Sequence, residues 1–138
     1  MRTQARFRTT LFTPLGNDDD QRENGRELAQ WLCANLPADL RPDAMAEGWG
    51  HRIDFGDPRL GNTIFVGCGH VEGDEWSCYC EPEPNRVERT APVAEMVRVI
   101  GAIDALLAKT TAISDVQWFQ NDAREREFNH APRAFARA

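Results

Sequence analysis

The chain has 138 residues, of which 22 are acidic and 16 are basic, and its formal net charge at pH 7 is −6. This length fits one domain with a single core. No apolar run approaches the roughly 18 residues of a transmembrane helix, and an acidic chain repels nucleic acid, so we expect neither a membrane nor a nucleic-acid partner.

The N-terminus, Met1 to Arg6, is not followed by the apolar stretch of a secretory signal, so a cytoplasmic protein with free cysteine thiols is expected. Charge is unevenly distributed along the chain. Residues 14–85 carry 15 acids against five arginines, whereas residues 1–13 carry three arginines and no acid. The acidic middle suits a cationic protein partner, although acids also keep small domains soluble.

The first predicted element is a strand at residues 6–13, which are rich in β-branched and aromatic side chains. Pro14 and Gly16 end this run because neither residue suits the interior of a strand. The next stretch, residues 17–20, reads Asn-Asp-Asp-Asp and is typical of a solvated turn.

A helix is predicted next, with Asn24 and Glu27 as a capping box at its start and Pro37 at its end. Its apolar residues recur at spacings of three and four, which gives one apolar face: Leu28, Trp31, Leu32 and Leu36. Residues 37–48 contain two prolines and are predicted to be a connector.

Three short runs rich in aromatic and β-branched residues follow, at 49–55, 63–70 and 76–80. Turn residues at 56–62 and 72–75 separate these runs. The pattern predicts a three-stranded antiparallel meander, around which the rest of the chain is organised.

After a proline-containing connector at 81–92, a second helix is predicted to begin at Pro92. Asp104 lies near the edge of its apolar face and is expected to pair with an arginine or to accept a hydrogen bond from an indole N–H. Residues 113–119 predict a last strand, and residues 120–138 a tail that is a short helix or disordered. The apolar face of the helix contains Val93, Met96, Val97, Ile100, Ile103 and Leu107.

These elements predict an α+β fold that spans residues 1–119 as a single domain. The expected order is strand, helix, three-stranded meander, helix, strand, in one antiparallel sheet. Both helices are expected to pack on one face of this sheet, which leaves the other face and the turns available to a partner.

Four potential zinc ligands lie on the second and third strands of the meander. Cys68 and His70 share one face of their strand, as do Cys78 and Cys80, because strand side chains alternate. A tight turn would pair His70 with Ser77 and place the two pairs on opposite faces. Only a loop one residue longer or shorter would bring all four together in a tetrahedral site. We therefore expect no metal or other cofactor, with this zinc or thiol site as the alternative.

The partner surface is predicted from charge and aromatic side chains. Acids cluster around the meander, where negative potential would steer a basic partner, and an exposed tryptophan would supply an apolar anchor. We predict a binding face that combines Trp49, Asp54, Asp57, Glu72, Asp74, Glu75 and Trp76.

Several motifs together resemble a group of small, uncharacterised bacterial proteins over residues 7–119. The motifs are Trp31-Leu32, Glu47-Gly48-Trp49-Gly50, Gly67-Cys68-Gly69, a tryptophan-led strand from Trp76 to Pro82, and the strand Asp115 to Phe119. In architecture such chains are similar to immunity proteins of polymorphic toxin systems, which are small, often acidic, cytoplasmic α+β proteins that bind and block a toxin.

This resemblance implies a non-enzymatic protein-binding module, with a basic toxin domain as its partner and no catalytic residue. The chain also lacks a Gly-x-Ser-x-Gly motif and a Gly-rich phosphate loop, so no enzymatic activity is expected. The alternatives are the zinc- or thiol-dependent protein described above and a homodimeric structural module.

Overall fold

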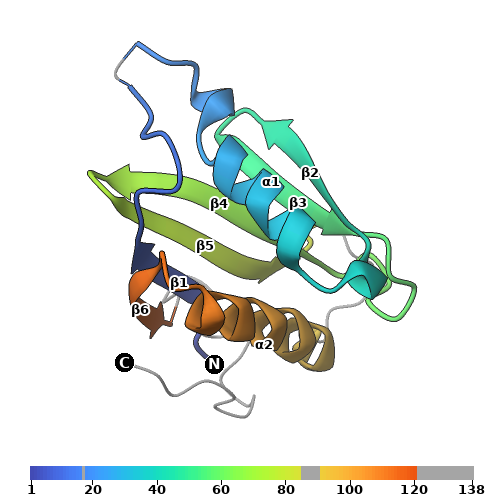
Figure 1. Cartoon of the computed structure of the whole chain (residues 1–138). Coiled ribbons are helices and arrows are strands. Elements are labelled where there is room, and N and C mark those ends of the chain that lie inside the picture. The colour runs from blue at the N-terminus through green and yellow to red at the C-terminus, as the bar shows by residue number, and fades with distance from the viewer. Residues whose placement is uncertain (17, 85–90, 121–138) are drawn as a thin grey trace.

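The computed structural model describes residues 1–16, 18–84 and 91–120 (Figure 1). In this part of the chain, six strands form one open antiparallel sheet, in the order β2-β3-β4-β5-β1-β6, and two α-helices complete an α+β fold. The strands are β1 (Gln4–Arg8), β2 (Pro42–Glu47), β3 (Gly50–Phe55), β4 (Ile64–Glu72), β5 (Glu75–Pro82) and β6 (Ser114–Phe119). The helices are α1 (Arg26–Asn35) and α2 (Val93–Lys109), with short 3₁₀ helices at η1 (Gln21–Glu23) and η2 (Ala38–Leu40).

Four strands, rather than three, separate the two helices. The connector predicted at 37–48 contains β2, which pairs with β3 over its whole length, from Pro42 opposite Phe55 to Glu47 opposite Gly50. Pro42 misled the prediction because proline is rare in strands. It is tolerated here as the first residue of an edge strand, where no neighbouring strand requires its N–H.

One hydrophobic core cluster contains side chains from both helices and from alternate strand positions. In α2, Ile100 and Leu107 are buried as predicted, but Val97 is only partly buried, whereas Val99 is completely buried. The side chain of Asp104 accepts a hydrogen bond from the indole Nε1 of Trp118 at 2.9 Å. This contact confirms the second of the two roles predicted for Asp104.

The start of α1 differs from the predicted capping box. Gly25, rather than Asn24, is the residue before the helix, in the left-handed conformation at φ 77°. The Oδ1 of Asn24 accepts a hydrogen bond from the backbone N–H of His70 at 2.8 Å, and the carboxylate of Glu27 binds Thr13. Both predicted capping side chains therefore hold other segments of the chain against α1.

Part of the predicted connector (residues 85–90) and nearly all of the predicted tail (residues 121–138) lie outside the described residues. Within the described ranges, no helix is long and apolar enough to cross a membrane.

Candidate functional site

The surface of the sheet that points away from the core cluster is built from the strand positions that alternate with buried ones. For example, Arg52 lies between the buried residues His51 and Ile53, and Tyr79 lies between the buried residues Cys78 and Cys80. Successive strand side chains point to opposite faces. The register therefore aligns one outward row across all six strands, namely Met45, Arg52, Gly67, Tyr79, Gln4 and Phe119.

The ring of Tyr79 lies over Gly67 in this row. A Cβ atom added at Gly67 would be 2.2 Å from Cζ of Tyr79, so only glycine leaves room for this ring position. Trp49, in the turn between β2 and β3, is 44% exposed, and its ring centroid lies 6.2 Å from that of Tyr79. Burial raises the pKa of the Tyr79 hydroxyl to about 12, so it remains a hydrogen-bond donor at neutral pH.

Arg52 connects the acids of this surface. Its guanidinium contacts Asp54 at 2.5 Å, also binds Glu83, and lies 3.9 Å from Glu47. The same guanidinium lies over the ring of Phe65, 4.3 Å from the centroid, in a cation–π contact. These contacts hold Arg52 in a fixed position on the sheet, with only 15% of its side chain exposed.

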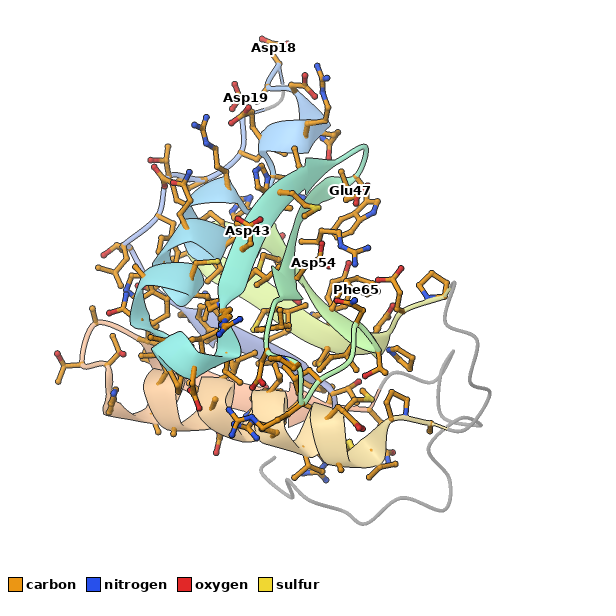
Figure 2. The ribbon with its side chains drawn as sticks, turned by 90° about the vertical axis from the view of Figure 1, so that its right-hand side faces the viewer. Asp18, Asp19, Asp43, Glu47, Asp54 and Phe65 are labelled. Atoms are coloured by element: carbon orange, nitrogen blue, oxygen red, sulfur yellow. The ribbon has the colours of Figure 1, made fainter. Side chains whose placement is uncertain are left out.

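Acids outnumber bases around Arg52. Asp43 lies directly opposite Asp54 in the β2–β3 pair, a placement that is unfavourable for two like charges. Among the described residues, no ion pair neutralises Asp43. Figure 2 looks onto the β2 edge, where Asp43, Glu47 and Asp54 lie along the two strands. We call Asp43, Glu47, Arg52, Asp54 and Glu83 the β2–β3 acidic patch.

The sequence prediction included only Asp54 and the adjacent Trp49 from this region. It missed Asp43 and Glu47 because residues 37–48 were interpreted as a connector. The available signal was the spacing of the two acids in residues 42–47, Pro-Asp-Ala-Met-Ala-Glu, because Asp43 and Glu47 share one face if this segment is extended.

Asp57, predicted to lie on the partner face, is buried in the loop that precedes β4. Its carboxylate is 2.8 Å from Nη2 of Arg59 and 3.6 Å from Nη2 of Arg98. The hydrogen bond from Arg59 lowers the pKa of Asp57. Its carboxylate therefore has little exposed surface to offer a partner.

The other predicted acids, Glu72, Asp74 and Glu75, lie in the turn at the far end of β4. Arg8 of β1 donates a 2.6 Å hydrogen bond to Asp74, and Arg6 lies 3.7 Å from Glu75. Two of these three acids therefore already have basic neighbours. The five predicted acids lie in three separate places, namely β3, the loop before β4 and the β4–β5 turn, so they do not form one cluster.

Trp76 belongs to the core and is only 2% exposed. Its ring packs against Phe12, at 5.3 Å between centroids, and against His70, at 4.8 Å. It therefore cannot provide the exposed anchor that the sequence suggested, and of the two predicted tryptophans only Trp49 is accessible.

The predicted pairing of the β4–β5 hairpin is wrong by one residue. Cys68 lies opposite Cys78, and His70 lies opposite Trp76, because the register shifts between His70 and Glu72. This shift places the four potential zinc ligands on the same side of the hairpin. Nevertheless, among the described residues no three His, Cys, Asp or Glu side chains are arranged to hold a metal ion. The Nε2 of His70 instead lies 2.9 Å from the carbonyl of Gly73.

The thiols of this hairpin are free and buried. Burial raises the pKa of Cys78 to about 12 and raises the pKa of Cys68 well above its ordinary value. Since the thiolate is the nucleophile and the metal ligand, these positions favour inert core thiols over a reactive pair.

The fold and this surface define the class of the protein, an α+β protein with one open antiparallel sheet and an outward face of mixed aromatic and acidic residues. No protein-family model, curated protein or solved structure matches the chain.

Proposed function

We propose that this protein is a non-enzymatic binding module of the immunity type, which holds a basic protein partner against the β2–β3 acidic patch and Trp49. The observation that carries this proposal is the position of an exposed tryptophan beside a patch with four acids and one arginine. Such a combination supplies an apolar anchor and electrostatic attraction on one surface.

Trp49 has the properties of an anchor residue. Nearly half of its surface is exposed, and Tyr79 supports one side of its ring. An aromatic side chain that is already held in place loses little conformational entropy on binding, so its burial contributes efficiently to affinity.

The patch favours a basic partner. Asp54 is paired with Arg52, whereas Asp43, which lies opposite it, has no ion pair among the described residues. A lysine or arginine from a partner would supply the missing positive charge. The negative potential would also increase the association rate, most strongly at low ionic strength.

The proposal requires that both helices cover one face of the sheet, so that the patch lies on the uncovered face. It is supported by the single core cluster to which both helices contribute. The resemblance to immunity proteins supplies the identity of the partner, a basic toxin domain, and a cytoplasmic location where that toxin would act.

The test begins with the isolation of a partner by affinity capture, its identification by mass spectrometry, and its purification. Association and dissociation rates are then measured by biolayer interferometry at several salt concentrations. The wild-type association rate should fall as salt rises, and Trp49→Ala should increase the dissociation rate at least about tenfold, as for a hot-spot residue. Co-expression with the chain should also neutralise the partner's toxicity.

A matched pair of charge reversals locates the interface. Asp43→Lys with Glu47→Lys should slow association at low salt, whereas Asp74→Lys with Glu75→Lys should have the smaller effect, because Arg8 and Arg6 already neighbour the second pair. If neither reversal nor Trp49→Ala changes the kinetics, this surface does not bind the partner.

A further inference from the structure

The outer side of β2 is an edge of the sheet. β2 is the first strand in the sheet order, and no described segment pairs with its outer side. At the start of the β2–β3 ladder, the N–H of Gly56 donates to the carbonyl of Arg41 at 2.9 Å, in continuation of the register. Hydrogen-bonded residues alternate in an antiparallel pair. The main-chain groups that point outward therefore belong to Pro42, Ala44 and Ala46.

The two edges of the sheet differ in regularity. At β6, the register with β1 shifts between Arg6 and Arg8, and Asp115 has a positive φ of 54°. Such irregularities prevent another strand from pairing with an edge. By contrast, β2 pairs with β3 at six consecutive positions without a shift, so its outer side is a regular template for an added strand.

The side chains of β2 leave this template accessible. Ala44 and Ala46 are small, and Ala46 is exposed. On the other side of the strand lie Asp43, Met45 and Glu47, at successive alternate positions, with Met45 38% exposed. An added strand would present every second side chain to this row. A partner strand that complements this row carries two basic residues four positions apart, opposite the two acids, and an apolar residue midway between them, opposite Met45.

From these features we infer that the partner adds a strand to the outer edge of β2, through an extended segment with the pattern basic-x-apolar-x-basic. This inference rests on the proposed function, since it specifies how the basic partner binds. Main-chain hydrogen bonds to Ala44 and Ala46 supply the strand pairing, and Asp43 and Glu47 select the basic side chains.

Charge opposes the same pairing between two copies of this chain. Antiparallel pairing of β2 with a second β2 would bring the Asp43 and Glu47 carboxylates of both copies together, and like charges across adjacent strands are destabilising. The acids of this edge therefore disfavour a homodimer and favour a basic strand.

The probe is a blocked peptide, Arg-Thr-Val-Thr-Arg, at millimolar concentration with the full chain labelled with ¹⁵N. We expect chemical-shift changes along β2 and several-fold slower amide exchange at Ala44 and Ala46. The control peptide, Arg-Arg-Thr-Val-Thr, has the same composition but places its arginines on opposite faces. It should bind measurably more weakly.

Ala46→Pro removes one outward N–H and should weaken peptide binding by roughly tenfold. Ala46→Val, which keeps that N–H, should not weaken it. If Ala46→Pro fails to fold, Asp43→Lys with Glu47→Lys replaces it, since both side chains are on the outer surface, and should abolish the difference between the two peptides.

Three outcomes would overturn strand addition. The first is a peptide response confined to Trp49 and Tyr79 with no protection of Ala44 or Ala46, which leaves the proposed function intact. The second is no response to the peptide, in which case the kinetics with a purified partner decide the proposed function separately. The third is a dimer by light scattering that Ala46→Pro dissociates.

Discussion

At the level of single residues, the role of a carboxylate in this protein depends on its neighbours rather than on its position in the sequence. Asp57 and Asp43 both lie in the acidic middle of the chain, residues 14–85. Asp57 is buried between Arg59 and Arg98, whereas Asp43 is exposed and faces Asp54. The first arrangement stabilises the fold, and the second leaves negative charge available to a partner.

Asp57→Asn should destabilise the protein at neutral pH. The pKa of Asp57 is lowered in the folded state by its hydrogen bond with Arg59. Its stabilising contribution is therefore present above the unfolded-state pKa of about 3.9 and is lost as the pH falls through the folded-state pKa. Urea denaturation of the wild type and the variant should differ clearly at pH 7 and converge as the pH is lowered below about 4.

Asp18→Asn is the matched control, because Asp18 is exposed. Its substitution should leave stability within about half a kcal/mol of the wild type. A pH-independent effect of Asp57→Asn would instead indicate that only the shape of the side chain matters.

The thiols should react slowly in the folded protein. Burial raises the pKa of Cys33 to about 11 and that of Cys78 to about 12, so both are protonated at neutral pH. Only Cys33 is partly exposed. Time-resolved alkylation followed by mass spectrometry should label Cys33 first, and the other three thiols only after unfolding. Rapid labelling of Cys78 in the native state would contradict this order.

At the level of elements, both helices bury an apolar face, and α1 adds a close backbone contact with the sheet. α2 buries a face that contains Ile100 and Leu107, and α1 buries one that contains Leu28. The N-terminus of α1 also lies directly on β4, where a Cβ atom at Gly25 would meet the backbone oxygen of Cys68 at 2.3 Å. The packing of the apolar faces depends on side-chain volume, and the contact at Gly25 depends on the absence of a side chain.

Ile100→Ala should lower the free energy of unfolding by about 2–5 kcal/mol, because it leaves a cavity in the core. Val97→Ala is the control within the same helix, and it should cost clearly less, since Val97 is only partly buried. Chemical denaturation measures both values. A loss below about half a kcal/mol for Ile100→Ala would place this residue outside the core.

Gly25→Ala should destabilise the protein by about 3 kcal/mol or more, because it combines a left-handed backbone with a clash against β4. Gly61 is the matched control. It also has a positive φ, 59°, but the nearest atom to an added Cβ is 3.8 Å away. Gly61→Ala should therefore cost only the conformational term, about 1–2 kcal/mol. Equal losses in thermal or urea unfolding would show that the approach of α1 to β4 is not tight.

At the level of the whole molecule, the sheet separates a core side from a surface of mixed charge. Met45, Tyr79 and Phe119 share one row on that surface, although they lie on strands that are distant in the sequence. The row brings acids from β2 and β3 beside an aromatic pair. The binding proposal depends on this assembly and on no single strand.

We expect protein purified without a chelator to contain no stoichiometric zinc. The described residues provide no group of three suitable ligands, and burial keeps the hairpin thiols protonated. Inductively coupled plasma mass spectrometry of the purified chain measures the content directly. One zinc per chain that is lost on Cys78→Ser would replace the binding proposal with the metal-dependent alternative.

The sequence by itself determined the elements whose apolar residues follow a local period. The face of α2 repeats every three to four residues, and the strands β3 and β6 are rich in aromatic and β-branched side chains, so α2, β3 and β6 were all predicted close to their observed positions. These signals depend on neighbouring residues along the chain, which a single sequence contains in full.

Only the tertiary structure decided which residues meet. The shift between His70 and Glu72 reversed the predicted relation of Cys68 to Cys78, because one extra residue in a strand moves its side chains to the other face. Pro42 concealed β2, because proline is tolerated mainly in edge strands and the sequence alone does not show which strand lies at an edge. The β2–β3 acidic patch and the exposure of Trp49 follow from the pairing of β2 with β3. This pairing depends on hydrogen bonds and packing between strands, which a local sequence pattern does not predict.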